Sequence, residues 1–92
     1  MDMQDCIEKA NTTDCLVKGN LTLSKYLFKK NSIENEALSS YYTSGSMLLQ
    51  TLGKLDDYDV DVLAKAYEME YNQTIELDDK TYCYWFKTRE YY

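Results

Sequence analysis

The 92-residue chain is predicted to form one α+β domain, mainly α, in which three to four helices precede a C-terminal β-hairpin (residues 1–92). Three observations predict this fold class. Apolar residues recur at helical spacing through the first two-thirds of the chain, β-forming residues dominate its end, and no proline, linker or repeat marks a domain boundary. With 45% apolar residues and ten tyrosines, the chain has the material for a hydrophobic core and differs from a disordered acidic tail.

Two helices are predicted before residue 31. Apolar residues from Met3 onward roughly follow helical spacing, and Gly19 is a suitable stop for this first helix. Asn20 or Thr22 is then suited to cap a short second helix. That helix would end at 29–30 in two lysines, whose charge is favoured at a helix C-terminus, so they need no role in binding nucleic acid.

The longest helix is predicted from Ser32 to about Leu52, with Gly53 as its end. Its buried stripe would consist of Ile33, Ala37, Tyr41, Leu48, Leu49 and Leu52. Gly45 lies inside this pattern, where a glycine costs about 1 kcal/mol relative to alanine. A bend or break near Gly45 is therefore the alternative.

A further helix is predicted from Asp56 or Asp57, because aspartate is favoured both as a cap and in the first turn. After it, the segments 74–77 and 81–87 are rich in β-formers and flank a polar turn at 78–80, which predicts a hairpin. On its second strand, alternation places Tyr82, Tyr84 and Phe86 on one side and Cys83 and Trp85 on the other.

Acidic residues are concentrated in the second half of the chain. Residues 56–79 contain nine carboxylates and one base, Lys65, whereas residues 1–31 contain four acids and five lysines. Helix capping accounts for two or three of these carboxylates, and the surplus predicts a surface that binds a partner with a basic groove. The residues assigned to this surface are Asp56, Asp57, Asp59, Asp61, Glu68, Glu70, Glu76, Asp78 and Asp79.

Several kinds of site are disfavoured by composition. The chain has no histidine, and its three glycines form no phosphate loop, so no enzyme activity and no cofactor are expected. Three cysteines (Cys6, Cys15 and Cys83) without CxxC spacing indicate neither a disulfide framework nor a zinc site.

Calcium binding is a lesser alternative. Asp57, Asp59, Asp61 and Glu68 match positions 1, 3, 5 and 12 of an EF-hand loop. The loop also needs glycine at its sixth position, and this chain has Val62 there. Since residues 62–65 continue like a helix, the match is interpreted as a coincidence.

No basic and apolar leader opens the sequence, and no apolar run approaches the ~18 residues of a membrane span. A cytoplasmic protein without a membrane partner is expected. With a net charge of −6, it is also expected not to bind nucleic acid itself.

The acid block at 56–61, the helical first two-thirds, the chain length and the tyrosine-rich ending at 82–86 resemble the anti-restriction nuclease proteins (Arn) of T-even phages. These are small early proteins that act as DNA mimics. The resemblance implies a phage protein that acts inside the infected host cell. There it would occupy the DNA-binding site of a host restriction endonuclease directed at modified-cytosine DNA. It assigns no individual catalytic or recognition residue.

A mimicry mechanism also follows from charge spacing. B-DNA carries a phosphate per roughly 3.4 Å of rise on each strand, and carboxylates three or four apart on a helix lie about 5–6 Å apart. Because a domain of this size spans only about nine base pairs, a homodimer joined through the hairpin or the longest helix is expected. The alternative is an acidic adaptor that docks on a basic regulator without imitating DNA.

Overall fold

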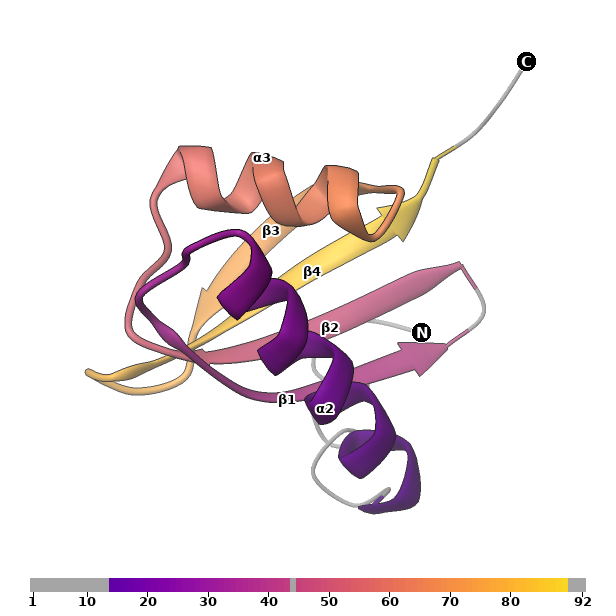
Figure 1. Ribbon diagram of the computed structural model, residues 1–92, viewed down its shortest axis with the longest axis horizontal. Helices are drawn as coiled ribbons and strands as arrows, with labels where there is room; N and C mark the ends of the chain where they lie inside the picture. The colour runs from indigo at the N-terminus through magenta and orange to yellow at the C-terminus, as the bar shows by residue number, and fades with distance from the viewer. Residues whose placement is uncertain (1–13, 44, 90–92) are drawn as a thin grey trace.

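The computed structural model describes residues 14–43 and 45–89, with only the backbone described at 14–21 and 43. The described residues form a four-stranded antiparallel sheet with two helices packed on one face (Figure 1). The elements are α2 (Asp14–Lys30), β1 (Glu36–Thr43), β2 (Ser46–Leu52), α3 (Asp57–Ala66), β3 (Met69–Glu76) and β4 (Thr81–Thr88). The strand order is β1-β2-β4-β3. The domain is thus α+β but mainly β, and the prediction of a mainly α fold was wrong.

The error lies in the predicted helix from Ser32 to Leu52, which is the hairpin of β1 and β2. Gly45 has a φ of +79°, a conformation that suits a turn and not a helix interior. The apolar pattern was misleading because Leu48 and Leu49 are buried on opposite faces of the sheet. A strand covered on both faces shows no alternation of apolar and polar residues.

Ser32 belongs to the end of α2 and does not begin a new helix. The Ile33 amide donates to the Phe28 carbonyl (2.9 Å) and the Ser32 amide to the Lys29 carbonyl (3.2 Å). Together with a φ of +57° at Ser32, this is the Schellman arrangement that terminates helices. The predicted stop at Gly19 is also wrong, because α2 runs through it as one helix. Residues 1–13 of the first predicted helix lie outside the described residues.

The predictions for the second half of the chain were closer. The α3 helix begins after Asp56, as expected, and buries Val60, Leu63 and Ala64. The C-terminal hairpin is also present, although β3 begins at Met69 and has a bulge between Tyr71 and Gln73. No helix in the described part of the chain is both long and apolar enough to cross a membrane.

The main core lies between the sheet and the two helices. It includes Leu27 and Phe28 of α2, Leu63 of α3, and Tyr84 and Phe86 of β4. The opposite face of the sheet has a smaller cluster of Tyr41, Leu48 and Cys83, with Trp85 beside it. The predicted alternation along β4 is therefore confirmed.

A buried group of hydroxyls joins α2, β1 and the end of α3. Ser24 Oγ is hydrogen bonded to Ser40 Oγ (2.9 Å) and to the Tyr67 hydroxyl (3.0 Å). The ring of Tyr67 also contacts Tyr42 edge-on, with centroids 6.2 Å apart. Burial raises the pKa of both tyrosines, and for Tyr42 the negative charge of an ionised Tyr67 raises it further.

Stability is therefore expected to fall in strongly alkaline solution. A tyrosine pKa is near 10 in the unfolded chain and higher in the folded one, so the unfolded state loses its proton first. The stabilisation is complete below about pH 10 and is lost as pH rises towards the folded pKa. Melting temperatures measured by circular dichroism from pH 8 to 11 should show a steeper decline for the wild type than for Tyr42→Phe. Equal slopes in the two proteins would contradict this account.

Candidate partner-binding surface

One end of the sheet collects three connecting segments of the chain. Across it, Glu36 of β1 pairs with Leu52 of β2, which pairs with Thr81 of β4. The Gly53 amide donates to the Lys80 carbonyl (2.7 Å), which ties the end of β2 to the β3–β4 turn. The Asn35 side chain donates to the Leu52 carbonyl (3.4 Å). These bonds hold the segments 31–35, 53–56 and 77–80 side by side.

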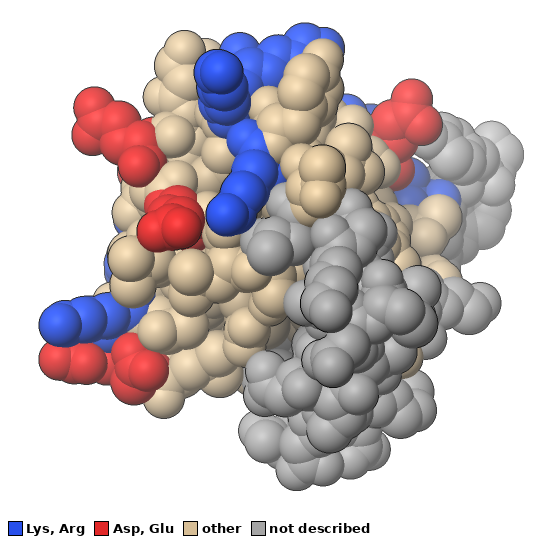
Figure 2. Space-filling view, turned by 60° about the horizontal axis from the view of Figure 1, so that its bottom comes forward, with Lys and Arg blue, Asp and Glu red and all other residues tan. Residues whose placement is uncertain are grey.

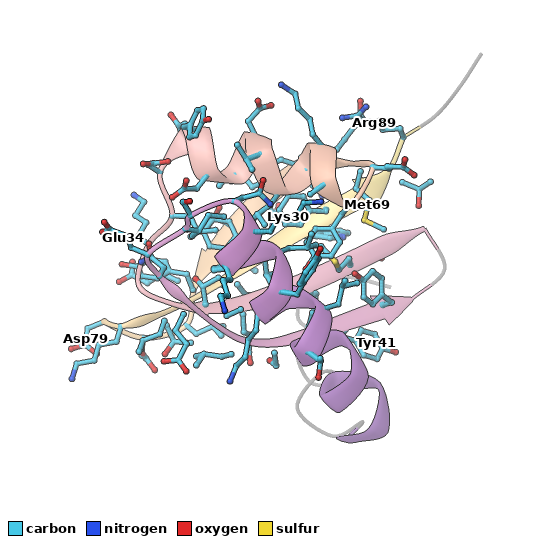
Figure 3. All side chains as sticks on the ribbon, viewed as in Figure 1. Lys30, Glu34, Tyr41, Met69, Asp79 and Arg89 are labelled. Atoms are coloured by element: carbon cyan, nitrogen blue, oxygen red, sulfur yellow. The ribbon has the colours of Figure 1, made fainter. Side chains whose placement is uncertain are left out.

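Acidic side chains from all these segments meet here. Figure 3 shows Glu34 and Asp79 at this end of the molecule and Met69 and Arg89 at the opposite end. We define the acidic end as the following residues: Glu34, Glu36, Asp56, Asp57, Asp59, Glu76, Asp78 and Asp79. In Figure 2, most of the carboxylates visible on that face lie along one side of the molecule.

The acidic end accounts for the net charge of the chain. The ranges 34–36, 54–59 and 76–80, which contain the acidic end, hold eight of the sixteen acidic residues and two of the ten basic residues, Lys54 and Lys80. Their formal charge of −6 equals that of the whole chain, so the remaining acids and bases cancel. The acidic end is therefore a strongly negative surface.

The first turn of α3 contributes three of these carboxylates. Asp56 caps the helix, and its Oδ1 accepts a hydrogen bond from the Asp59 amide (2.7 Å). Desolvation, followed by the negative charges of Asp56 and Glu34, raises the pKa of the Asp59 carboxyl above its usual range. The contribution of Glu34 indicates that carboxylates from separate segments repel each other at this end of the molecule.

The β3–β4 turn contributes two more. Asp78 Oδ1 accepts hydrogen bonds from the amides of Lys80 and Thr81, both at 2.8 Å. The bond from Lys80 is the main reason that the pKa of Asp78 is lowered. Asp56 and Asp78 thus stabilise local structure, whereas Asp57 and Asp79 are exposed and have no such bond to another described residue.

Three of the predicted surface residues lie elsewhere. Asp61 is further along α3 and forms an ion pair with Lys65 (2.9 Å). Glu68 and Glu70 lie at the opposite end, where Glu70 pairs with Lys87 across the sheet. The structure therefore brings Asp56, Asp57, Asp59, Glu76, Asp78 and Asp79 together but not these three.

Sequence reasoning missed Glu34 and Glu36. Both fell in the first turn of the predicted helix from Ser32, where acidic residues are favourable and need no further explanation. If Gly45 had been interpreted as the turn of a β1–β2 hairpin, these two residues would have been identified as candidates, since a glutamate at the start of a strand has no capping role.

A buried hydrogen bond holds the acidic end on the core. The Tyr84 hydroxyl, within the core, accepts a bond from the Leu55 amide (2.7 Å), directly before Asp56. Burial raises the pKa of Tyr84 above its usual range.

Tyr84→Phe is expected to destabilise the domain by about 1–3 kcal/mol, because it leaves the buried Leu55 amide without an acceptor. Urea unfolding followed by circular dichroism measures this change. Tyr82→Phe, whose half-buried ring lies two residues earlier on the same strand, is the control and should cost less. An equal loss in the two variants would contradict the role of the Leu55 bond.

The residues that match an EF-hand loop in sequence lie mostly on a helix in the structure. Asp57, Asp59 and Asp61 lie on helix α3, and side chains two apart on a helix point in different directions. No group of three or more carboxylates or thiols among the described residues could hold a metal ion.

Beside the acidic end, a groove of about 920 Å³ lies between α3 and β3. Residues that line it include Asp57 and Asp61 from α3, Tyr71 and Glu76 from β3, and Tyr82 and Tyr84 from β4. We call it the α3–β3 groove. It is continuous with the acidic end, because Asp57 and Glu76 belong to both.

No family model, curated protein or solved structure matches this chain.

Proposed function

We propose that this protein is a DNA mimic whose acidic end occupies the DNA-binding site of a host restriction endonuclease directed at modified-cytosine DNA. The observation that supports the proposal most is that eight carboxylates, from segments far apart in the sequence, converge on one end of the sheet. A DNA-binding cleft carries lysine and arginine to match phosphates, and a concentrated array of carboxylates competes for the same groups.

The dimensions of the acidic end fit this role. Four strands at a spacing of about 4.8 Å place the outer strands roughly 14 Å apart. This is close to the width of the DNA major groove, about 12 Å, which is bordered by two rows of phosphates. Acidic residues lie on both outer strands, at Glu36 and Glu76, and on the turn and helix between them.

The proposed mimic acts as a homodimer without enzymatic activity. The longest dimension of the domain is 37 Å, which corresponds to only about eleven base pairs of B-DNA. A two-fold dimer would extend the negative surface if its two acidic ends point away from the contact. Light scattering coupled to size-exclusion chromatography measures the oligomeric state.

A competition assay tests the proposed function. A modified-cytosine-directed endonuclease is bound to a fluorescent duplex that carries its site, and the protein is added at increasing salt concentration. We expect displacement of the duplex, with an apparent affinity that falls steeply with salt because the complex uses ion pairs.

Two results would overturn the proposal. An adaptor would bind the endonuclease while the duplex stays bound, and that outcome assigns the acidic end to docking without mimicry. Direct, specific binding of the protein to the duplex alone would also contradict mimicry, because a mimic repels nucleic acid.

A further inference from the structure

The α3–β3 groove combines carboxylates with aromatic rings. Asp57 and Asp61 line it from the helix, Glu76 lines it from the strand, and three tyrosines, Tyr71, Tyr82 and Tyr84, lie between them. A volume of about 920 Å³ lies within the range of pockets that take ligands. We propose that this groove binds an extended segment of a partner protein that carries arginine or lysine side chains at alternate positions.

The chemistry of the lining favours a cationic side chain. A guanidinium or ammonium group is attracted by the face of a tyrosine ring and forms charge-assisted hydrogen bonds with carboxylates. Tyr71 is 45% exposed, so its ring is accessible. Two bases also line the groove, Lys54 and Arg89, but Arg89 Nε already donates to the Met69 carbonyl (3.4 Å).

An extended conformation follows from the position of β3. This strand is last in the sheet order, and no described strand pairs with its outer edge. The bulge between Tyr71 and Gln73 interrupts that edge and leaves residues 73–76 regular. A segment that added to this edge would be extended, and every second side chain would point towards the groove.

The inference deepens the proposed function and rests on it for the identity of the partner. The groove opens from the acidic end through Asp57 and Glu76, so an endonuclease bound there would have its basic loops beside the groove. The acidic end would then contact the DNA-binding cleft, while the groove holds one extended arm of the same enzyme.

A peptide titration tests the groove without the endonuclease. The probe is the capped heptapeptide Val-Arg-Val-Arg-Val-Arg-Val, and its control is the same peptide with uncharged citrulline in place of arginine. In two-dimensional NMR spectra of the full chain, we expect the amides of residues 73–76 and of α3 to shift on addition of the probe. The affinity of the citrulline peptide should be lower by a factor of at least about ten. Shifts confined to Glu34 and the β3–β4 turn, or equal binding of both peptides, would overturn the inference.

Variants separate the groove from general negative charge. Tyr71→Ala should weaken the probe about threefold through loss of the ring. Thr74→Arg, which places a positive group in the groove, should weaken it by about tenfold. Asp79→Asn, at the acidic end but outside the groove, is the matched control and should stay within about twofold. If Asp79→Asn weakens the probe as much as Thr74→Arg does, the binding is not specific to the groove.

The two proposals fail separately. Probe binding in the groove without displacement of DNA from the endonuclease would remove the proposed function and retain the groove. Displacement of DNA with no probe binding would retain the function and remove the groove as a site.

Discussion

Asp59→Asn and Asp79→Asn are each expected to weaken inhibition of the endonuclease by about 1–3 kcal/mol, and the double variant by roughly the sum. Both side chains belong to the acidic end, and neither is the acceptor that caps its turn. Each would lose an ion pair with a lysine or arginine of the target. The salt dependence of binding should also become shallower by about one counterion for each variant.

The measurement is the duplex competition assay at several salt concentrations. Folding should be unaffected, because Asp56 and Asp78 accept the local hydrogen bonds, and desolvation and neighbouring negative charges raise the pKa of Asp59 and so disfavour its ionised form. Glu68→Gln is the control, since it removes one negative charge at the opposite end of the molecule. If this control weakens inhibition as much as Asp79→Asn, only the net charge matters and the acidic end has no special role.

Phe86→Ala is expected to have the largest effect on stability, a loss of about 3–5 kcal/mol. The side chain of Phe86 on β4 is fully buried, and its ring contacts Tyr67 and Tyr71 with centroids 6.4 and 6.0 Å away. Its removal leaves a cavity between the sheet and α3. Because small domains have a total stability of about 5–15 kcal/mol, this variant should be close to unfolding at room temperature.

Urea unfolding with a fluorescence or circular dichroism signal measures the loss. Thr88→Ala on the same strand is exposed and should change the free energy of unfolding by less than about 0.5 kcal/mol. A loss below 1 kcal/mol for Phe86→Ala would mean that the core between β4 and α3 is not as described.

The sequence predicted the elements that local chemistry determines. Asp56 marks the start of α3 because a carboxylate can accept the hydrogen bond of a first-turn amide, and this bond is present. The polar turn at 78–80 marked the C-terminal hairpin, and Asp78 accepts two amide hydrogen bonds there. Both signals are contained within a few residues of the chain.

The β1–β2 hairpin could not be predicted by the same reasoning. Its apolar residues fit helical spacing because Leu48 faces the small cluster and Leu49 the main core. Tertiary packing on both faces of the sheet, which no local pattern encodes, decides between helix and strand here. Gly45 was the one local signal, and an interior glycine is compatible with either a bent helix or a turn.

The same limit applies to the candidate site. The acid block at 56–61 was visible in the sequence, but the contributions of Glu34 and Glu36 depend on strand pairing between residues far apart. Conversely, Glu68 and Glu70 are close to the acid block in sequence and lie at the opposite end of α3 and β3. Proximity along the chain therefore wrongly placed Glu68 and Glu70 on this surface and omitted Glu34 and Glu36.

The concentration of the net charge at one end has a consequence for how the protein meets its target. A charge of −6 displaced from the centre of the domain gives the molecule a large electric dipole. Within a Debye length of a basic cleft, about 8 Å at physiological salt, the field of the cleft exerts a torque on this dipole. The torque turns the acidic end towards the cleft before contact. The proposed inhibitor would thus arrive already oriented, and its association rate would exceed that of a domain with the same charge spread evenly over its surface.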